Sequence, residues 1–242
     1  MLRTKLTTKR PKNAGIRIAL LALILICLAL EAPQAGLAGR ERFVPPDITK
    51  ASDIPYPVEV VASGLVTLSL NLTTDGQAPT VQVLRDIQGL TSLASTIVTA
   101  WRFTPGTLDG NPTPSTMNVQ IVFNANGVQG QTLQVPPVAI TPPPFPAGYL
   151  PAEVAAASYA TYPVSSVGQG AVVLDVTVDE HGETKKIGVI RDVPSLTPQA
   201  IAAVKSWTIN AATFNGKPIT SKLVVAYVFS WPKQKPRSIG VQ

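Results

Sequence analysis

The sequence is poor in the residues that build redox, metal and imidazole chemistry. It has one cysteine, Cys27, and one histidine, His181, among 242 residues. A single cysteine excludes an intrachain disulfide framework and a cysteine-based zinc cluster. A single histidine excludes a multi-histidine metal site. Because we also find no nucleophile–base pair, the sequence predicts no catalytic residue, no metal ligand and no cofactor, and it favours a protein that is not an enzyme.

Charge is also scarce, and it is unevenly placed. Charged residues make up 14% of the chain, with 20 Lys and Arg against 14 Asp and Glu, a net charge of +6. Residues 1–42 hold eight basic and two acidic residues, so this segment alone carries the whole net charge. A nucleic-acid-binding domain would keep a basic face without its N-terminus, so we expect no nucleic-acid partner. A basic N-terminus instead fits a targeting or anchoring signal.

The basic N-terminus is followed by an apolar run. Ile18–Leu30 spans 13 residues, which is shorter than the roughly 20 that a membrane-spanning helix needs. Arg17 can extend its guanidinium to the headgroups, so a longer span from Ala14 to Leu37 stays open. Basic residues before the run keep the N-terminus cytoplasmic and place the rest of the chain outside the cytoplasm. Two readings stay open: an uncleaved membrane anchor, and a signal peptide cleaved before Gly39.

The exported part contains an internal repeat. At an offset of 106 residues, residues 54–123 align with residues 160–229 without a gap and with 23 identities in 70 pairs. The aligned pairs include Tyr56-Pro57 with Tyr162-Pro163, Arg85-Asp86 with Arg191-Asp192, Trp101 with Trp207, and Gly110 with Gly216. The exported part is therefore predicted to be a tandem of two small domains.

Each unit carries the same periodicity. Apolar residues alternate over residues 66–72 and 172–178, which predicts a strand with one buried face, and Gly76 or Gly182 then supplies a hairpin turn. A second strand, a helix with one apolar stripe and a last alternating strand follow. We therefore predict an α+β fold: two tandem small β-β-α-β domains, each a three-stranded antiparallel sheet with one packed helix, after an N-terminal apolar helix.

The predicted division of the chain follows from these patterns. It consists of a cytoplasmic basic end plus membrane anchor or signal peptide (residues 1–38), a short linker (39–53), the first domain (54–124), a Pro-rich linker (125–159), the second domain (160–232) and a tail (233–242). Seven of the 23 prolines lie within residues 135–151. Such a composition predicts an extended, semi-rigid spacer between the two domains.

The ordered set of motifs resembles the TonB C-terminal domain family. The Tyr-Pro opening, the Gly before an alternating strand, the helix that ends in Trp, and the Gly-Lys-Pro turn all occur in the family's order. The second unit matches best, with Ala200-x-x-x-Val204-x-x-Trp207 followed by Asn215-Gly216-Lys217-Pro218. The resemblance covers both repeat units.

The resemblance implies a location and a set of partners. It implies a single-pass protein of the cell inner membrane, held there by its N-terminal helix, with the bulk of the chain in the periplasm. Its partner would be a peptide of an outer-membrane TonB-dependent receptor, captured by strand addition. It would transduce proton-motive energy, supplied by an inner-membrane motor complex, to transport across the outer membrane.

We place the predicted peptide-binding site in the second unit. A three-stranded sheet leaves two unpaired edges, and the outward residues of the last strand are apolar there, which suits a captured strand or a homodimer partner. Cover by the other unit or by the C-terminal tail is the open alternative, and a packed turn is the alternative for the Tyr-Pro pair. The predicted residues are Tyr162, Pro163, Lys222, Val224, Ala226 and Val228.

A second hypothesis belongs to a different class of protein. An unpowered periplasmic scaffold or adaptor would use the same edge strands to pair domain to domain or chain to chain, as in a homodimer. Binding of receptor-type peptides distinguishes the two hypotheses.

Overall fold

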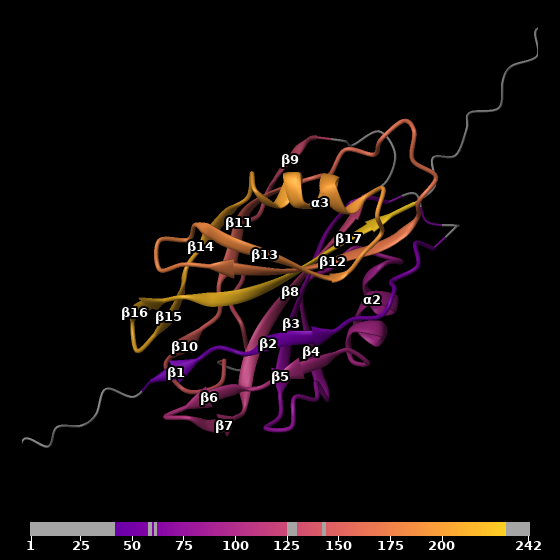
Figure 1. The fold of residues 1–242 in the computed structure, drawn as a ribbon. Coiled ribbons are helices and arrows are strands. Elements are labelled where there is room, and N and C mark those ends of the chain that lie inside the picture. The colour runs from indigo at the N-terminus through magenta and orange to yellow at the C-terminus, as the bar shows by residue number, and fades with distance from the viewer. Residues whose placement is uncertain (1–41, 58–59, 61, 125–129, 142–143, 231–242) are drawn as a thin grey trace, which may run out of the picture. The chain divides into compact units, whose positions relative to one another are not determined.

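The computed structural model describes residues 42–57, 60, 62–124, 130–141 and 144–230 (Figure 1). The first half contains β1 (Phe43–Val44), β2 (Asp47–Lys50), β3 (Gly64–Leu72), β4 (Thr80–Arg85), α2 (Thr91–Val98), β5 (Arg102–Thr104), β6 (Gly106–Leu108), β7 (Asn111–Thr113) and β8 (Ser115–Asn124). After β9 (Thr132–Gln134), the second half contains β10 (Tyr149–Leu150), β11 (Glu153–Ser158), β12 (Gly170–Val178), β13 (Thr184–Arg191), α3 (Thr197–Val204), β14 (Thr208–Asn210), β15 (Ala212–Phe214), β16 (Lys217–Ile219) and β17 (Ser221–Phe229).

The structure is mostly β with two short helices and two repeated β-rich units, as the element order shows. The predicted β-β-α-β order is present in both units, as β3-β4-α2-β8 and β12-β13-α3-β17. The repeat is longer than predicted, because the same offset of 106 residues places Phe43-Val44 of β1 on Tyr149-Leu150 of β10. We therefore call residues 43–124 the first unit and residues 149–230 the second unit.

The two units share one sheet. Its six strands run in the order β13-β12-β17-β8-β3-β4, so the last strands of both units lie side by side at its centre. β17 and β8 pair in parallel, with Val224 opposite Val119 and Phe229 opposite Asn124, while the other pairs are antiparallel. Strands that are apolar on both faces can occupy the centre of a sheet, and β17 reads as such a run. The two separate sheets predicted from the sequence are thus joined into one.

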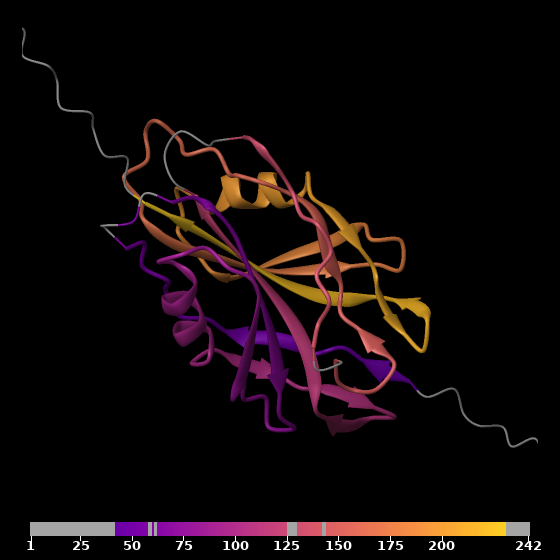
Figure 2. The same ribbon diagram turned by 180° about the vertical axis from the view of Figure 1, so that it is seen from behind.

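The helices cover opposite faces of this sheet (Figures 1 and 2). β8 and β17 are equivalent strands of the two units, and they pair in parallel. One unit is therefore turned over relative to the other, so that equivalent faces of the two units lie on opposite sides of the sheet. Each hydrophobic core consequently draws on both units: Leu65 and Val122 of the first unit join the core under α3, and Val224 and Ala226 of the second join the core under α2. Neither core is complete within one unit.

The Pro-rich segment differs from the predicted spacer. Over its described residues it forms β9, β10 and β11, and it buries Val154 and Ala157 in the core of the second unit. It also contacts the first unit, where Asn118 Nδ2 donates to the Ala152 carbonyl at 3.2 Å. Directly after the segment, the Ala160 carbonyl accepts from Asn124 Nδ2 at 3.0 Å. The prolines exclude a helix here, but the valines and alanines between them are apolar enough to be buried.

Several predictions fall on residues outside the described part of the chain. They include the N-terminal helix of residues 14–30 and the tail of residues 233–242. Among the described residues, no helix has the length and apolar character that crossing a bilayer requires.

Candidate peptide-binding surface

Three of the four predicted residues on β17 lie inside the sheet. Val224, Ala226 and Val228 are fully buried. One edge of β17 pairs with β12 and the other pairs with β8. The edge predicted to be free is therefore occupied by the last strand of the first unit. This corresponds to the alternative that the other unit covers the edge. The physical cause is that β8 offers a buried strand with unpaired backbone groups on the same chain.

Lys222 is engaged by carboxylates instead of facing an open groove. Its Nζ forms an ion pair with Asp175 and a second with Asp47 at 3.3 Å, and its side chain is 25% exposed. Burial opposes the charge of Lys222, but the hydrogen bonds and charge attraction of Asp175 and Asp47 together outweigh it and raise the pKa of Lys222. Desolvation raises the pKa of Asp175. Lys222 therefore ties β17 to β12 and to β2 of the first unit.

The predicted Tyr-Pro pair forms a packed turn. The Tyr162 hydroxyl donates to the Gly168 carbonyl at 2.7 Å, and its ring lies 6.2 Å from that of Phe229 between centroids. Tyr162 is buried and Pro163 is half-buried. The next residue, Val164, is fully exposed, so this turn borders solvent and lies outside strand β17.

Two strand edges remain in the described sheet, on β4 and on β13. Each of these strands pairs with one neighbour only over the residues that the structure describes. At the β4 edge Arg85 Nη2 donates to the Pro136 carbonyl at 2.7 Å, so the segment between the units reaches that edge. At the β13 edge Lys185 and Lys186 are exposed.

A trough of about 680 Å³ lies beside β13, and we call it the β13 trough. The end of α3 and strand β14 complete its walls. Its apolar lining consists of Ile187, Ile201, Trp207 and Ile209, and its basic lining consists of Lys185, Lys186 and Lys205, with His181 and Glu183 at the turn before β13. An unpaired strand edge beside an apolar and basic trough is suited to holding an extended peptide.

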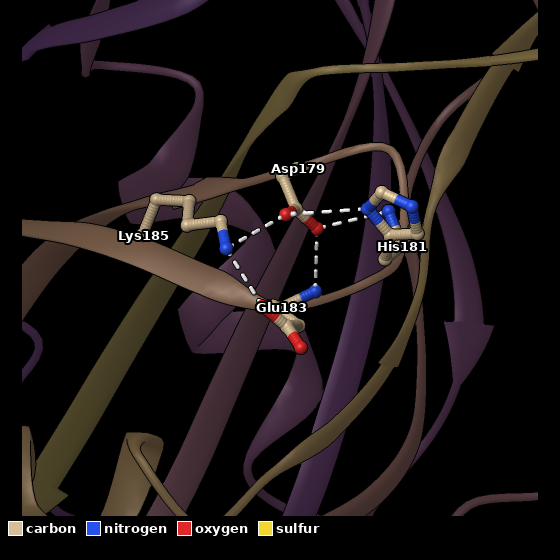
Figure 3. A network of polar contacts seen from close by, with 4 residues as sticks. All are labelled: Asp179, His181, Glu183 and Lys185. Carbon is tan, nitrogen blue, oxygen red and sulfur yellow. Dashed lines mark hydrogen bonds and ion pairs between the residues drawn. The ribbon is translucent and has the colours of Figure 1, made fainter.

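The turn between β12 and β13 fixes one end of the trough (Figure 3). The Asp179 carboxylate accepts hydrogen bonds from the backbone N–H groups of His181 and Glu183, both at 2.9 Å, and pairs with Lys185 Nζ at 3.0 Å. Lys185 also pairs with Glu183 at 2.7 Å. Desolvation opposes the charge of Asp179, but these contacts outweigh it and lower the pKa of Asp179. The hydrogen bonds of Lys185 to Glu183 and Asp179 raise the pKa of Lys185.

The trough lysines were not predicted from the sequence. Lys185 and Lys186 come from β13 and Lys205 from the end of α3, so only the fold brings them together. A signal was nonetheless present in the repeat. The offset of 106 residues aligns the three lysines with Pro79, Thr80 and Thr99, which are all uncharged.

A duplicated β-β-α-β unit with free strand edges defines a class of small protein-binding domains. Both copies match the family model described as Gram-negative bacterial TonB protein C-terminal, over residues 55–125 and 159–231. The two matches together cover more than half of the chain, and the chain belongs to this family as two tandem copies. Comparison with curated proteins and with solved structures gave no match.

Membership of the family settles the coarse questions of function. The family is one of non-enzymatic transducers, which confirms the prediction that the protein is not an enzyme. It indicates a TonB-like role in energy transduction, partners among TonB-dependent receptors, and a periplasmic location for the two units.

Proposed function

We propose that this protein is a single-pass inner-membrane transducer, anchored by residues 14–30, with its two family units in the periplasm. It binds an extended peptide of an outer-membrane TonB-dependent receptor by strand addition. It then passes proton-motive energy from an inner-membrane motor complex to transport across the outer membrane. The observation that carries the proposal is a pair of family copies whose shared sheet keeps unpaired strand edges.

The structure bears on where the peptide binds. A peptide can reach Val224, Ala226 and Val228 only after β8 has separated from β17, because both edges of β17 are paired. Addition at β4 or β13 needs no such separation. We therefore propose addition at a free edge in the closed sheet, with pairing at β17 as a second mode that requires opening.

Peptide binding is tested with the full chain in detergent. Receptor peptides of the TonB-box type should bind saturably, measured by fluorescence anisotropy. The matched control is the same peptide with proline at alternate positions, which removes backbone N–H donors and should weaken binding by about tenfold or more. Absence of saturable binding, or equal binding of the proline peptide, contradicts the proposal.

Energy coupling is tested at the N-terminus. Sequencing of the mature protein should find Met1 intact, since an anchored transducer needs its membrane segment. Replacing residues 1–38 by a cleavable signal peptide should abolish receptor-dependent uptake while leaving peptide binding unchanged. Processing before Gly39 in the natural protein, or unchanged uptake by the released protein, overturns the anchored mechanism.

One observation favours the scaffold as a second candidate function. The two units already pair edge to edge within the chain through β8 and β17. The same pairing between chains at β4 or β13 would build a homodimer or a larger assembly. Concentration-dependent dimerisation in sedimentation experiments, without binding of receptor peptides, would favour the scaffold.

A further inference from the structure

The β13 trough collects most of the lysines that distinguish the two units. At five positions the second unit has a lysine where the first has an uncharged residue. Three of the five line the trough, namely Lys185, Lys186 and Lys205. The other two are Lys217, on the β15–β16 hairpin, and Lys222, which pairs with carboxylates. The lysine differences between the two units are therefore concentrated at one surface.

The corresponding surface of the first unit lacks this chemistry. Ser95 stands there in place of the apolar Ile201, and Pro79 stands in place of Lys185. The first unit has Arg102 where the second has Thr208, but Arg102 Nη1 donates to the Ala100 and Trp101 carbonyls at 3.1 and 3.0 Å. Its cation is thus directed to the backbone.

The trough lysines differ in how far carboxylates compensate their charge. Lys185 pairs with Asp179 and Glu183, whereas neither Lys186 nor Lys205 has a carboxylate within ion-pair distance among the described residues. Both side chains belong to exposed residues. Lys186 is attracted to the charge of Asp175, so Lys205 carries the less compensated charge beside the apolar floor, and both lysines favour an acidic ligand that also carries apolar side chains.

The free edge of β13 sets the conformation of that ligand. A segment added to β13 is an extended strand, whose successive side chains point to opposite faces of the sheet. Every second side chain would face the trough, where Ile187, Ile201 and Trp207 offer apolar contact. Lys186 and Ile187 are adjacent on β13 and therefore lie on opposite faces, so a segment in which acidic and apolar residues alternate can turn its apolar side chains toward Ile187 and its acidic side chains toward Lys186.

The charges argue against occupants from this protein. Residues 231–242 contain Lys233, Lys235 and Arg237 and no acidic residue, and residues 1–41 carry seven basic residues against two acidic ones. Either terminus would bring like charge to the trough. Pairing of β13 with β13 of a second copy would place lysines against lysines. A partner of opposite charge fits better than any of these.

We propose that the β13 trough is the docking site for an acidic extended segment of a partner protein, which adds to β13 as a seventh strand of the sheet. This inference rests on the proposed function, because it assigns a place and a charge to the captured peptide. It differs from pairing at β17, which remains sealed by β8 while the segment is bound.

The test titrates the full chain with a short labelled peptide that alternates glutamate with valine. Saturable binding is expected, and it should weaken as salt rises because exposed charges are screened. The variant Lys186→Thr with Lys205→Thr, which copies the first unit, should weaken binding by about tenfold. The matched control Lys217→Thr removes a lysine outside the trough and should change the affinity by less than about twofold.

Hydrogen exchange supplies a readout that surface attraction alone would not move. Bound peptide should slow exchange in residues 184–191 and leave residues 80–85 unchanged, because a strand is added at one edge only. The proposal is overturned if the affected amides lie elsewhere, or if Lys217→Thr weakens binding as much as the trough variant does. A rise in affinity of about tenfold on truncation after Ser230 would identify the tail as the occupant instead.

The outcomes also separate this inference from the proposed function. If receptor peptides bind equally well to the trough variant, the function stands and the docking site is wrong. If the acidic peptide protects β13 but no receptor peptide binds, the docking site stands and the receptor is not its partner. Equal competition by anionic lipid vesicles would show a surface for negative charge rather than a site for a strand, and would overturn the inference.

Discussion

The two units share a frame but differ in the charge that they display on it. Each has six acidic residues, whereas the first has three basic residues and the second has six. The shared positions are mostly structural: Trp101 and Trp207 are both buried at the end of their helices, and Gly76 and Gly182 both have positive φ in hairpin turns. The positions that differ include the β13 trough. The two units thus share the sheet and differ in the charge along one of its edges.

The units also differ on the outer faces of their central strands. In the first unit this face carries Asn118 and Gln120, and in the second it carries Val224 and Ala226, yet all four are buried. Asn118 donates to the Ala152 carbonyl near the start of the second unit, and Gln120 Oε1 accepts from Thr67 at 2.7 Å. The valine and alanine face instead packs in the core that contains Ile48 and Ile54. Each unit is therefore covered in part by the N-terminal residues of the other unit.

The largest expected effect tests this mutual cover. Ala226→Asp places a charge at a fully buried position of the β8–β17 seam and should cost about 3–5 kcal/mol, since a buried charge has no partner there. Urea unfolding should show one transition for residues 42–242, shifted as a whole. The control is Val189→Asp on the edge strand β13, where the side chain is 43% exposed and the cost should be below about 1 kcal/mol.

Two separate unfolding transitions, with the first unaffected by Ala226→Asp, would break the comparison. The units would then be independent domains that merely touch. A single shifted transition would show that the duplicated unit lost its independence when the sheets were joined.

A second prediction concerns a charge pair that only the second unit contains. Lys222→Thr leaves Asp175, whose side chain is 12% exposed, without its nearest cation and should cost about 2 kcal/mol. Adding Asp175→Ser copies the first unit, which has Thr116 and Ser69 at these positions, and should restore most of the loss. Chemical denaturation of the single and double variants measures the difference, and an additive loss in the double variant would contradict the compensation.

The sequence could predict the elements of each unit, because apolar alternation and glycine turns are local signals. The strands around Val66 and Val172 and the helices that precede Trp101 and Trp207 lie where these patterns indicate. The joining of the sheets could not be read in this way. It depends on β8 pairing with β17 across about a hundred residues of chain, and apolar residues on both faces of β17 suit a central strand and a captured edge equally well.

The candidate site was predicted less well than the fold. The predicted site depends on the last strand being an edge of the sheet, and any partner strand removes that edge. This applies to Lys222, Val224, Ala226 and Val228. The trough lysines lie about twenty residues apart and converge only when β13 and α3 are in place. A position-by-position comparison of the two units could have found these lysines. Residues that the common fold requires are shared by both units, so the residues that differ point to other roles.

A third prediction compares the two tryptophans. Trp207 Nε1 donates to the Tyr227 hydroxyl at 3.0 Å, and that hydroxyl donates to the Ser158 carbonyl at 2.7 Å in a buried network. Tyr227→Phe leaves both groups unpaired and should cost about 1–2 kcal/mol. Trp101 Nε1 donates to exposed Ser52 at 3.2 Å, so Ser52→Ala should cost less than about 0.5 kcal/mol, because water can replace the hydroxyl. Equal losses in thermal unfolding would contradict this ranking.

The smallest expected effect lies in the two hairpin turns and depends on pH. The pKa of Asp179 is lowered from its ordinary value of 3.8, because hydrogen bonds from Lys185 and two backbone N–H groups outweigh desolvation. A carboxyl whose pKa is lower in the folded state stabilises the fold above its unfolded pKa, and this contribution is lost as the pH falls through the folded value. Asp179→Asn should therefore lower the urea midpoint at neutral pH, and the gap to the natural protein should close as the pH falls below about 4.

Asp75 is the carboxylate in the corresponding turn of the first unit, where Thr73 aligns with Asp179. A hydrogen bond from the Thr73 hydroxyl is the largest cause of its lowered pKa, and no lysine pairs with it among the described residues. Asp75→Asn should thus produce a smaller gap with the same pH dependence, because it removes fewer charge-assisted contacts. A gap that stays constant from neutral to acid pH would show that the Asp179 turn is stabilised by its geometry alone, and that Lys185 is held at the trough by the strand rather than by the carboxylate.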